Sequence, residues 1–166
     1  MAGVFLRINV SGMDKIGANL KARASKAIDL RPAFDAIADD FAQREKVLFN
    51  RGGSVSGFRK WAPLSKAYRE RKVAAGYPAD TLVRTGALRA SLSVRSHPYF
   101  VYRATRSWMK IGTSVPYASY HQTGTRRMPA REPIRITDTQ RKTWAKIIER
   151  HIFGRTSKDP SVSLEA

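Results

Sequence analysis

The sequence predicts a single α+β domain, with one antiparallel β-sheet, amphipathic helices packed on one face of it, and long basic loops. Two observations support this fold class. Several short stretches alternate between apolar and polar residues, and longer stretches carry apolar residues at helical spacing. In chain order, a strand and helices precede further strands and a last helix. We expect the domain to span residues 1–153 and residues 154–166 to form a polar C-terminal tail.

A strand and two helices are expected first. Residues 4–10 alternate with the period of a half-buried strand, and residues 14–28 place apolar side chains on one helical face. Pro32 suits the first turn of a second helix, which should end at the glycines 52–53. The apolar stripe of this second helix consists of Phe34, Ile37, Ala38, Phe41 and Leu48.

Residues 51–63 form a loop by composition, and the loop contains two large aromatic residues. We favour a core position for Trp61. For Phe58 two interpretations remain open, packing on the core or an exposed anchor for another subunit. The anchor interpretation depends on the neighbouring Arg59 and Lys60, since aromatic and arginine side chains are enriched at interface hot spots.

The middle of the chain predicts helices and then a meander. A very basic helix should cover residues 64–75, and a loop through Thr85 and Gly86 should lead into a short helix. Alternation over residues 91–113, interrupted by the turn signal at His97, predicts three antiparallel strands.

The last third predicts a short helix over residues 116–122, ended by Gly124, and an edge strand at Ile134 and Ile136. Residues 137–140 have the pattern of a capping box that opens the last helix. The apolar stripe of that helix consists of Trp144, Ile147, Ile148, His151 and Ile152.

The charge is strongly positive and uneven. The chain has 31 Lys and Arg against 13 Asp and Glu, a net charge of +18, and residues 81–131 contain no acid. Such a field attracts polyanions and acidic protein surfaces, although a solvated surface is the simpler interpretation. Three arginines in the turn at Gly124 and Pro129 should project together. The candidate interface residues are Phe58, Arg59, Lys60, Arg126, Arg127 and Arg131.

Signals for catalysis and cofactors are weak. The histidines 97, 121 and 151 have no metal-pair spacing, and the chain contains no cysteine. Asp39 and Asp40 have no third carboxylate nearby in the sequence, as a nuclease would require. We therefore expect no catalytic, cofactor-binding or metal-binding residues. No apolar run approaches the roughly 18 residues of a membrane span, so no membrane partner is expected.

Three ordered segments carry a family resemblance. They are Trp61-Ala-Pro-Leu-Ser65, Leu82-Val-Arg-Thr-Gly-Ala-Leu88, and the stretch MKIGTSVPYASYHQTGTRRMPAREP at residues 109–133. In this order they resemble the phage virion morphogenesis (tail completion) family of tailed bacteriophages, over roughly residues 55–136. The family motif maps onto Trp61, Pro63, Leu64, Thr85, Gly86, Leu88, Gly112, Tyr117, Ala118, His121, Gln122, Gly124, Pro129, Ala130 and Arg131.

The resemblance implies a structural neck protein, of the tail-completion or tail-terminator type. Such a protein forms a ring, expected to be a hexamer, at the head-proximal end of the tail and enables head–tail joining. The implied partners are further copies of the chain, the tail tube protein and head-side connector or stopper proteins, with non-specific contact to genomic DNA in the lumen left open. The implied location is the virion neck, and the host cytoplasm during assembly. The alternative is a basic nucleic-acid-binding protein, supported by charge alone.

Overall fold

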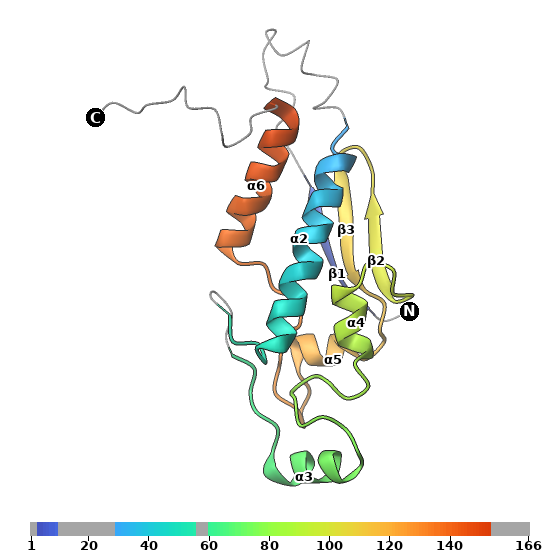
Figure 1. The fold of residues 1–166 in the computed structure, drawn as a ribbon, viewed down its shortest axis with the longest axis vertical. Coiled ribbons are helices and arrows are strands. Elements are labelled where there is room, and N and C mark those ends of the chain that lie inside the picture. The colour runs from blue at the N-terminus through green and yellow to red at the C-terminus, as the bar shows by residue number, and fades with distance from the viewer. Residues whose placement is uncertain (1–2, 10–28, 56–59, 154–166) are drawn as a thin grey trace, which may run out of the picture.

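The computed structural model describes residues 3–9, 29–55 and 60–153, and this part of the chain has an α+β fold (Figure 1). The expected fold class is confirmed. The helix expected over residues 14–28, the side chains of Phe58 and Arg59, and the C-terminal tail lie outside the described residues. In chain order the elements are β1 (Val4–Asn9), α2 (Arg31–Asn50), α3 (Lys66–Ala74), α4 (Ala87–Ser93), β2 (Phe100–Ala104), β3 (Trp108–Thr113), α5 (Ala118–Thr123) and α6 (Asp138–Phe153).

The sheet has the strand order β1-β3-β2, and β3 pairs antiparallel with both neighbours. The register places Leu6, Ile111 and Tyr102 in one row across the three strands. Because side chains alternate between the faces of a strand, every second residue of each strand shares this face. The core face of the sheet therefore consists of Val4, Leu6, Ile8, Phe100, Tyr102, Ala104, Met109, Ile111 and Thr113.

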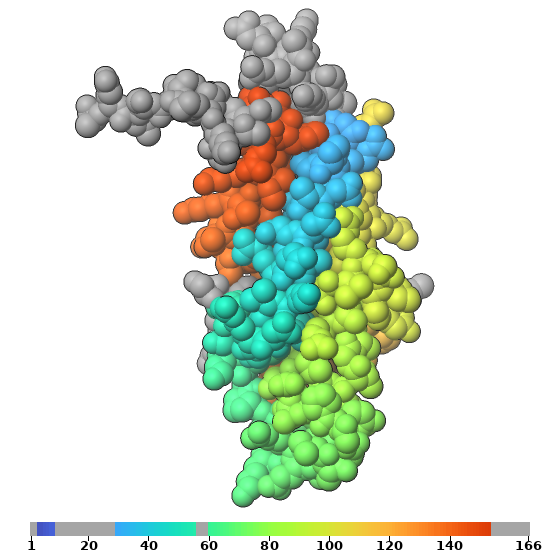
Figure 2. All heavy atoms as spheres, in the orientation of Figure 1, coloured from blue at the N-terminus to red at the C-terminus, as the bar shows by residue number. Residues whose placement is uncertain are grey.

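Helix α2 is the central helix on this face. It contacts α4 and α6, and α4 contacts β2 and β3, so α2 lies between α6 and the α4–sheet unit (Figures 1 and 2). The predicted stripe of α2 is confirmed, since Phe34, Ile37 and Phe41 are fully buried. Burial of such side chains contributes about 1.5–3 kcal/mol each.

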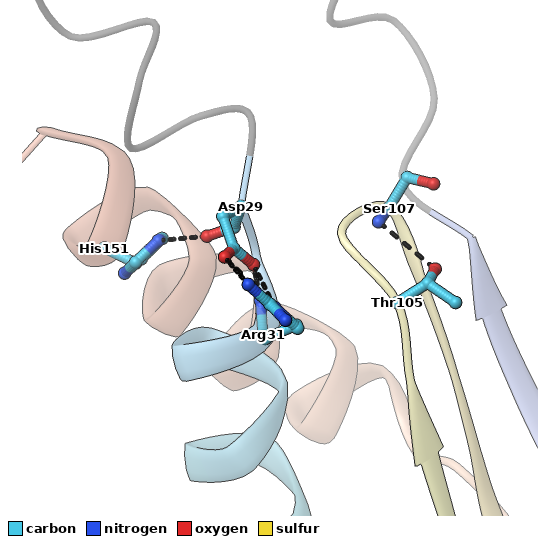
Figure 3. A network of polar contacts seen from close by, with 5 residues as sticks. All are labelled: Asp29, Arg31, Thr105, Ser107 and His151. Carbon is cyan, nitrogen blue, oxygen red and sulfur yellow. Dashed lines mark hydrogen bonds and ion pairs between the residues drawn. The ribbon is translucent and has the colours of Figure 1, made fainter.

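Polar contacts join the segment before α2 to α6 (Figure 3), and a backbone hydrogen bond joins that segment to the β2–β3 hairpin. The Nε2–H of His151 donates to the carbonyl of Asp29 at 2.8 Å, and the backbone N–H of Leu30 donates to the carbonyl of Arg106 at 3.0 Å. Hydrogen bonds from Arg31 lower the pKa of the Asp29 carboxyl to about 2. His151, expected on the apolar stripe of α6, thus anchors that helix to the segment before α2.

The strand predicted at residues 91–95 is wrong. Leu92 is fully buried within α4, which ends at Ser93 with Val94 as its C-cap. Ser91 donates to the carbonyl of Leu88 and accepts a hydrogen bond from Thr113 at 2.8 Å, which fixes the helix against β3. The third strand of the sheet is β1, from the other end of the chain.

The edge strand predicted at Ile134 and Ile136 is also wrong, because these residues lie in an irregular segment. The Gln122 side chain takes the place of a strand neighbour. Its amide nitrogen donates to the carbonyl of Ile134 at 2.8 Å, and its amide oxygen accepts from the Ile134 N–H at 3.2 Å. One side chain therefore satisfies the backbone groups that a sheet would otherwise have paired.

Helix α2 also carries a carboxyl group into the core. Glu45 is 2% exposed, and its Oε2 has no hydrogen-bond partner within the described structure. Burial disfavours the carboxylate and raises the pKa of Glu45 well above its ordinary value. Because the pKa is higher in the folded state, the stability that this group contributes is complete below the unfolded pKa and is lost as pH rises through the folded pKa.

Glu45→Gln should therefore weaken the loss of stability at rising pH. Urea unfolding at pH 5 and pH 8 should show a smaller decrease for the variant than for the wild type, by about 1 kcal/mol or more. Glu149→Gln, a change at an exposed position of α6, is the matched control and should keep the wild-type pH dependence. Equal pH dependence in wild type and Glu45→Gln would contradict this account.

Candidate functional site

Arg131 and Trp61 tie together loops that lie about 70 residues apart in the sequence. The Arg131 guanidinium donates to the carbonyl of Ala62 at 2.7 Å and to that of Pro63 at 3.0 Å. The indole N–H of Trp61 donates to the carbonyl of Glu132 at 3.0 Å. Each loop thus donates side-chain N–H groups to backbone carbonyls of the other loop.

A third motif residue, Gln122, adds α5 to this connection through its bonds to Ile134. The backbone N–H of Arg131 also donates to the carbonyl of His121 at 2.8 Å. We refer to Trp61, Gln122 and Arg131 with their backbone partners as the loop clasp. It joins residues 61–63, 121–122 and 131–134.

The expectation that Arg131 projects together with Arg126 and Arg127 is wrong. Arg131 is 7% exposed, whereas Arg126 and Arg127 are exposed on the turn that precedes it. Two backbone carbonyls provide the hydrogen bonds that make burial of the guanidinium tolerable. Its desolvation lowers the pKa of Arg131, but an arginine remains charged in a protein.

Trp61 is a core residue, as expected. It is buried and meets Phe49 edge to face, with ring centroids 5.1 Å apart. Its indole N–H is satisfied by the loop clasp. The same side chain therefore fixes the loop to α2 on one side and to the segment after Arg131 on the other.

The two glycines of the Thr-Gly and His-Gln-x-Gly segments have positive φ. Gly86 precedes α4 with φ +82°, and Gly124 ends α5 with φ +75°. Around Gly86 the space is open, but a Cβ at Gly124 would lie 2.7 Å from the backbone nitrogen of Ala130. Gly124 is therefore required by conformation and by close backbone approach.

Residues 60–86 form an arm, with α3 standing away from the rest of the molecule (Figure 1). Ser65 caps α3 by accepting a hydrogen bond from the Tyr68 N–H at 3.4 Å. Lys72 is buried, and its Nζ donates to the carbonyls of Asp80 and Val83, both at 2.6 Å. Lys72 thus holds the outgoing and returning halves of the arm together.

A pocket of about 830 Å³ lies between the arm and the rest of the domain, which we call the body. The loop clasp closes the root of the arm beside it, because Pro63 and Arg131 belong to both features. The motif residues that line the pocket are Pro63, Leu64, Thr85, Gly86, Leu88, Tyr117, His121, Pro129 and Arg131. The structure thus brings most of the predicted motif to one place.

The remaining motif residues support the site from outside the pocket. Trp61 and Gln122 act through the loop clasp, and Ala118 is fully buried at the beginning of α5. Gly112 lies in β3 opposite Phe5 of β1, and Gly124 packs against Ala130.

His121 is the motif residue with the most unusual surroundings. It is half-buried, and its Nδ1 is buried without a hydrogen-bond partner in the described ranges. Burial, with a smaller effect of the nearby Arg131 charge, lowers the pKa of His121. The imidazole is therefore neutral at neutral pH. Among the residues that the structure describes, the pocket lining contains no Asp, Glu or Cys that could act with it.

Sequence reasoning missed several pocket residues. Lys72, Tyr68 and Arg84 line the pocket from the arm. The Arg84 guanidinium lies over the Tyr77 ring, 4.5 Å from its centroid. The high charge of the helix concealed Lys72, because nothing in the sequence separates one internal lysine from its exposed neighbours. Among the residues that the structure describes, no group of three His, Cys, Asp or Glu side chains could hold a metal ion.

The fold and the site define a small basic α+β protein with an arm and a pocket at the root of that arm. The chain belongs to the phage virion morphogenesis family, which it matches over residues 12–159. This is a family of phage structural and assembly proteins, so the chain has a virion-associated assembly role. No curated protein and no solved structure shows significant similarity to it. None of the helices in the described ranges has the length and apolar character to span a membrane.

Arg131→Gln should destabilise the fold by about 2–4 kcal/mol, because a buried side chain loses its charged hydrogen bonds to the carbonyls of Ala62 and Pro63. Arg126→Gln, five positions earlier and exposed, should change stability by less than about 0.5 kcal/mol. Urea unfolding of the two variants measures both effects. An Arg131→Gln variant as stable as Arg126→Gln would show that the loop clasp contributes little to folding.

The two glycines should respond differently to alanine. Gly86→Ala should cost about 1–2 kcal/mol, the penalty of a left-handed conformation. Gly124→Ala should cost more, because the added Cβ would also displace the backbone at Ala130. Thermal melting of both variants gives the order, and a smaller loss for Gly124→Ala would disprove the close-approach argument.

Proposed function

We propose that the chain is a tail-completion protein that forms a ring at the head-proximal end of the phage tail and enables head–tail joining. The role is structural and needs no catalytic step. The family membership supports the assembly role, and the arm is the observation that supports ring formation. The ring is hexameric in this proposal, to match a sixfold tail tube.

The arm has the properties of a contact element. In α3 every side chain except Lys72 is exposed, including Tyr68 at 44% and Val73 at 51%. A nine-residue helix is not stable alone in water. This one stands away from the body, and its cap and the hydrogen bonds of Lys72 stabilise it there. A subunit with an arm on one side can contact the next subunit head to tail, and repeated contacts of this kind close a ring.

The expected partners are other copies of the chain within the ring, the tail tube protein below it and head-side connector or stopper proteins above it. The location is the neck of the virion, after assembly in the host cytoplasm. Arg126 and Arg127 on their exposed turn, and Lys60 at the beginning of the arm, remain candidate interface residues. Arg131 acts through the loop clasp instead.

A second candidate function is DNA contact, and the outer face of the sheet favours it. Lys110 lies 3.6 Å from the centroid of the Phe5 ring, and Arg7 lies 5.0 Å from that of Trp108. Arg103 shares this face, opposite Lys110. Basic and aromatic side chains interleaved in this way are typical of surfaces that contact nucleic acid. In a neck ring, such a face would border the path of the DNA.

The decisive experiment compares phage particles made with and without the protein. Without it, electron microscopy should show filled heads and finished tails that remain unjoined, and wild-type protein supplied in trans should restore joining. Labelled protein should be located at the neck. Normally joined particles in its absence, or label elsewhere in the particle, would refute the proposal.

A matched pair of variants tests the arm. Val73→Glu on α3 should leave the melting temperature nearly unchanged and block ring formation or joining, because it places a carboxylate in an apolar contact. Val94→Glu on the body, at a residue of similar exposure (46%), is the control and should join normally. Infectious titre and particle images are the measurements. A wild-type titre for Val73→Glu would exclude the arm from the ring contact.

A further inference from the structure

We propose that the pocket between the arm and the body binds a short peptide segment of another virion protein, one that combines an apolar side chain with at least one carboxylate. This inference rests on the proposed assembly function and adds the chemistry of the partner. Four properties of the pocket support it: its size, its apolar walls, its net positive charge and an unsatisfied buried nitrogen.

The pocket has the dimensions of a ligand site. Its volume of about 830 Å³ falls within the range of about 300–1,000 Å³ that such sites occupy. Its apolar walls come from both sides, Leu64 and Leu82 from the arm, Leu88 and Met128 from the body. This space accepts a few side chains of an extended segment rather than a folded domain.

The charge of the pocket has one sign. Lys72, Arg84, Arg127 and Arg131 line it, and no carboxylate of the described residues does. Lys72 and Arg131 donate hydrogen bonds to backbone carbonyls, and in the described part of the chain neither forms a salt bridge. Asp80 offsets part of the Lys72 charge, whereas no ion pair among the described residues neutralises Arg131. A carboxylate near Arg84 and Arg127 would gain charge-assisted hydrogen bonds in this field.

The unpartnered Nδ1 of His121 favours a peptide segment over a simple anion such as phosphate. Buried polar atoms without partners are rare in folded proteins, because each costs free energy. Nδ1 is closed to solvent in this conformation, so a ligand reaches it only when the His121 side chain turns toward the pocket that it lines. A peptide backbone then offers an N–H and a carbonyl side by side, which can satisfy either tautomer of the neutral imidazole. A phosphate without a proton offers only acceptors.

The other occupants fit less well. A second copy of the chain would bring a surface of the same sign, since the net charge is +18. Nucleic acid prefers an open basic surface, such as the outer face of the sheet, to an apolar pocket. The chemistry of the walls therefore points to an acidic and apolar segment of a different protein.

Photo-crosslinking in assembled particles tests the inference. Tyr68→p-benzoylphenylalanine places the probe on the pocket, and Tyr120→p-benzoylphenylalanine places it on an exposed tyrosine of α5 that does not line the pocket. After irradiation, mass spectrometry of the products identifies what each probe touched. Only the Tyr68 probe should crosslink to a segment of another virion protein that contains Asp or Glu beside apolar residues.

Two neighbouring arginines provide the charge control. Arg127→Gln should reduce the Tyr68 crosslink several-fold, and Arg126→Gln, whose side chain does not line the pocket, should leave it unchanged. Melting curves establish that both variants fold. Crosslinks from the Tyr68 probe to other copies of the chain are expected from the arm contact in the ring. Crosslinks to DNA, crosslinks to other copies alone, or crosslinks to other virion proteins no stronger than those of the Tyr120 probe would overturn the inference in particles that carry the protein at the neck. Joined particles that lack the protein altogether would instead refute the proposed function.

Discussion

The burial of the Arg131 guanidinium is the constraint on which the site depends. A charged group can leave water only where its donors are paired, and here the acceptors are backbone carbonyls of Ala62 and Pro63. Prolines at positions 63, 129 and 133 remove backbone donors from these loops, so a strand ladder cannot join them. Side-chain donors join the loops instead, and they fix the root of the arm without a sheet.

How much the sequence predicts depends on whether the signal is local. The stripe of α2, the alternation of β1 and the capping box before α6 are confirmed, because each specifies its own element. Two alternating apolar residues at residues 92–94 and 134–136 could not distinguish a strand from a helix end or a loop. The Ser91–Thr113 and Gln122–Ile134 contacts decide those two cases, and both are tertiary. Arg131 was misplaced for the same reason, since three arginines in one turn look alike until one of them meets carbonyls 68 and 69 residues away.

The positive charge of the chain therefore has two physical roles. Lys72 and Arg131 are internal, and burial lowers the pKa of each, while their N–H groups organise backbone segments. Arg126 and Arg127 are exposed and contribute little to folding. The net charge alone cannot separate these roles. Internal cations that cross-link loops also make the adjacent pocket electropositive, so the same residues that stabilise the arm determine which ligands the pocket attracts.

The position of the pocket gives binding there a mechanical consequence. Leu64 and Leu82 belong to the arm, whereas Leu88 and His121 belong to the body, so any bound segment contacts both. The clasp connects the arm to the body at its root, and Lys72 holds the two halves of the arm together. An occupant of the pocket would add a further connection between the arm and the body. A partner that binds in the pocket stabilises the arm orientation to which it binds most tightly. The size of this stabilisation equals the difference between the partner's binding free energies for that orientation and for the others. In a ring built through these arms, subunits that have bound the partner would present their contact surfaces in one direction, which couples recognition of the partner to closure of the ring.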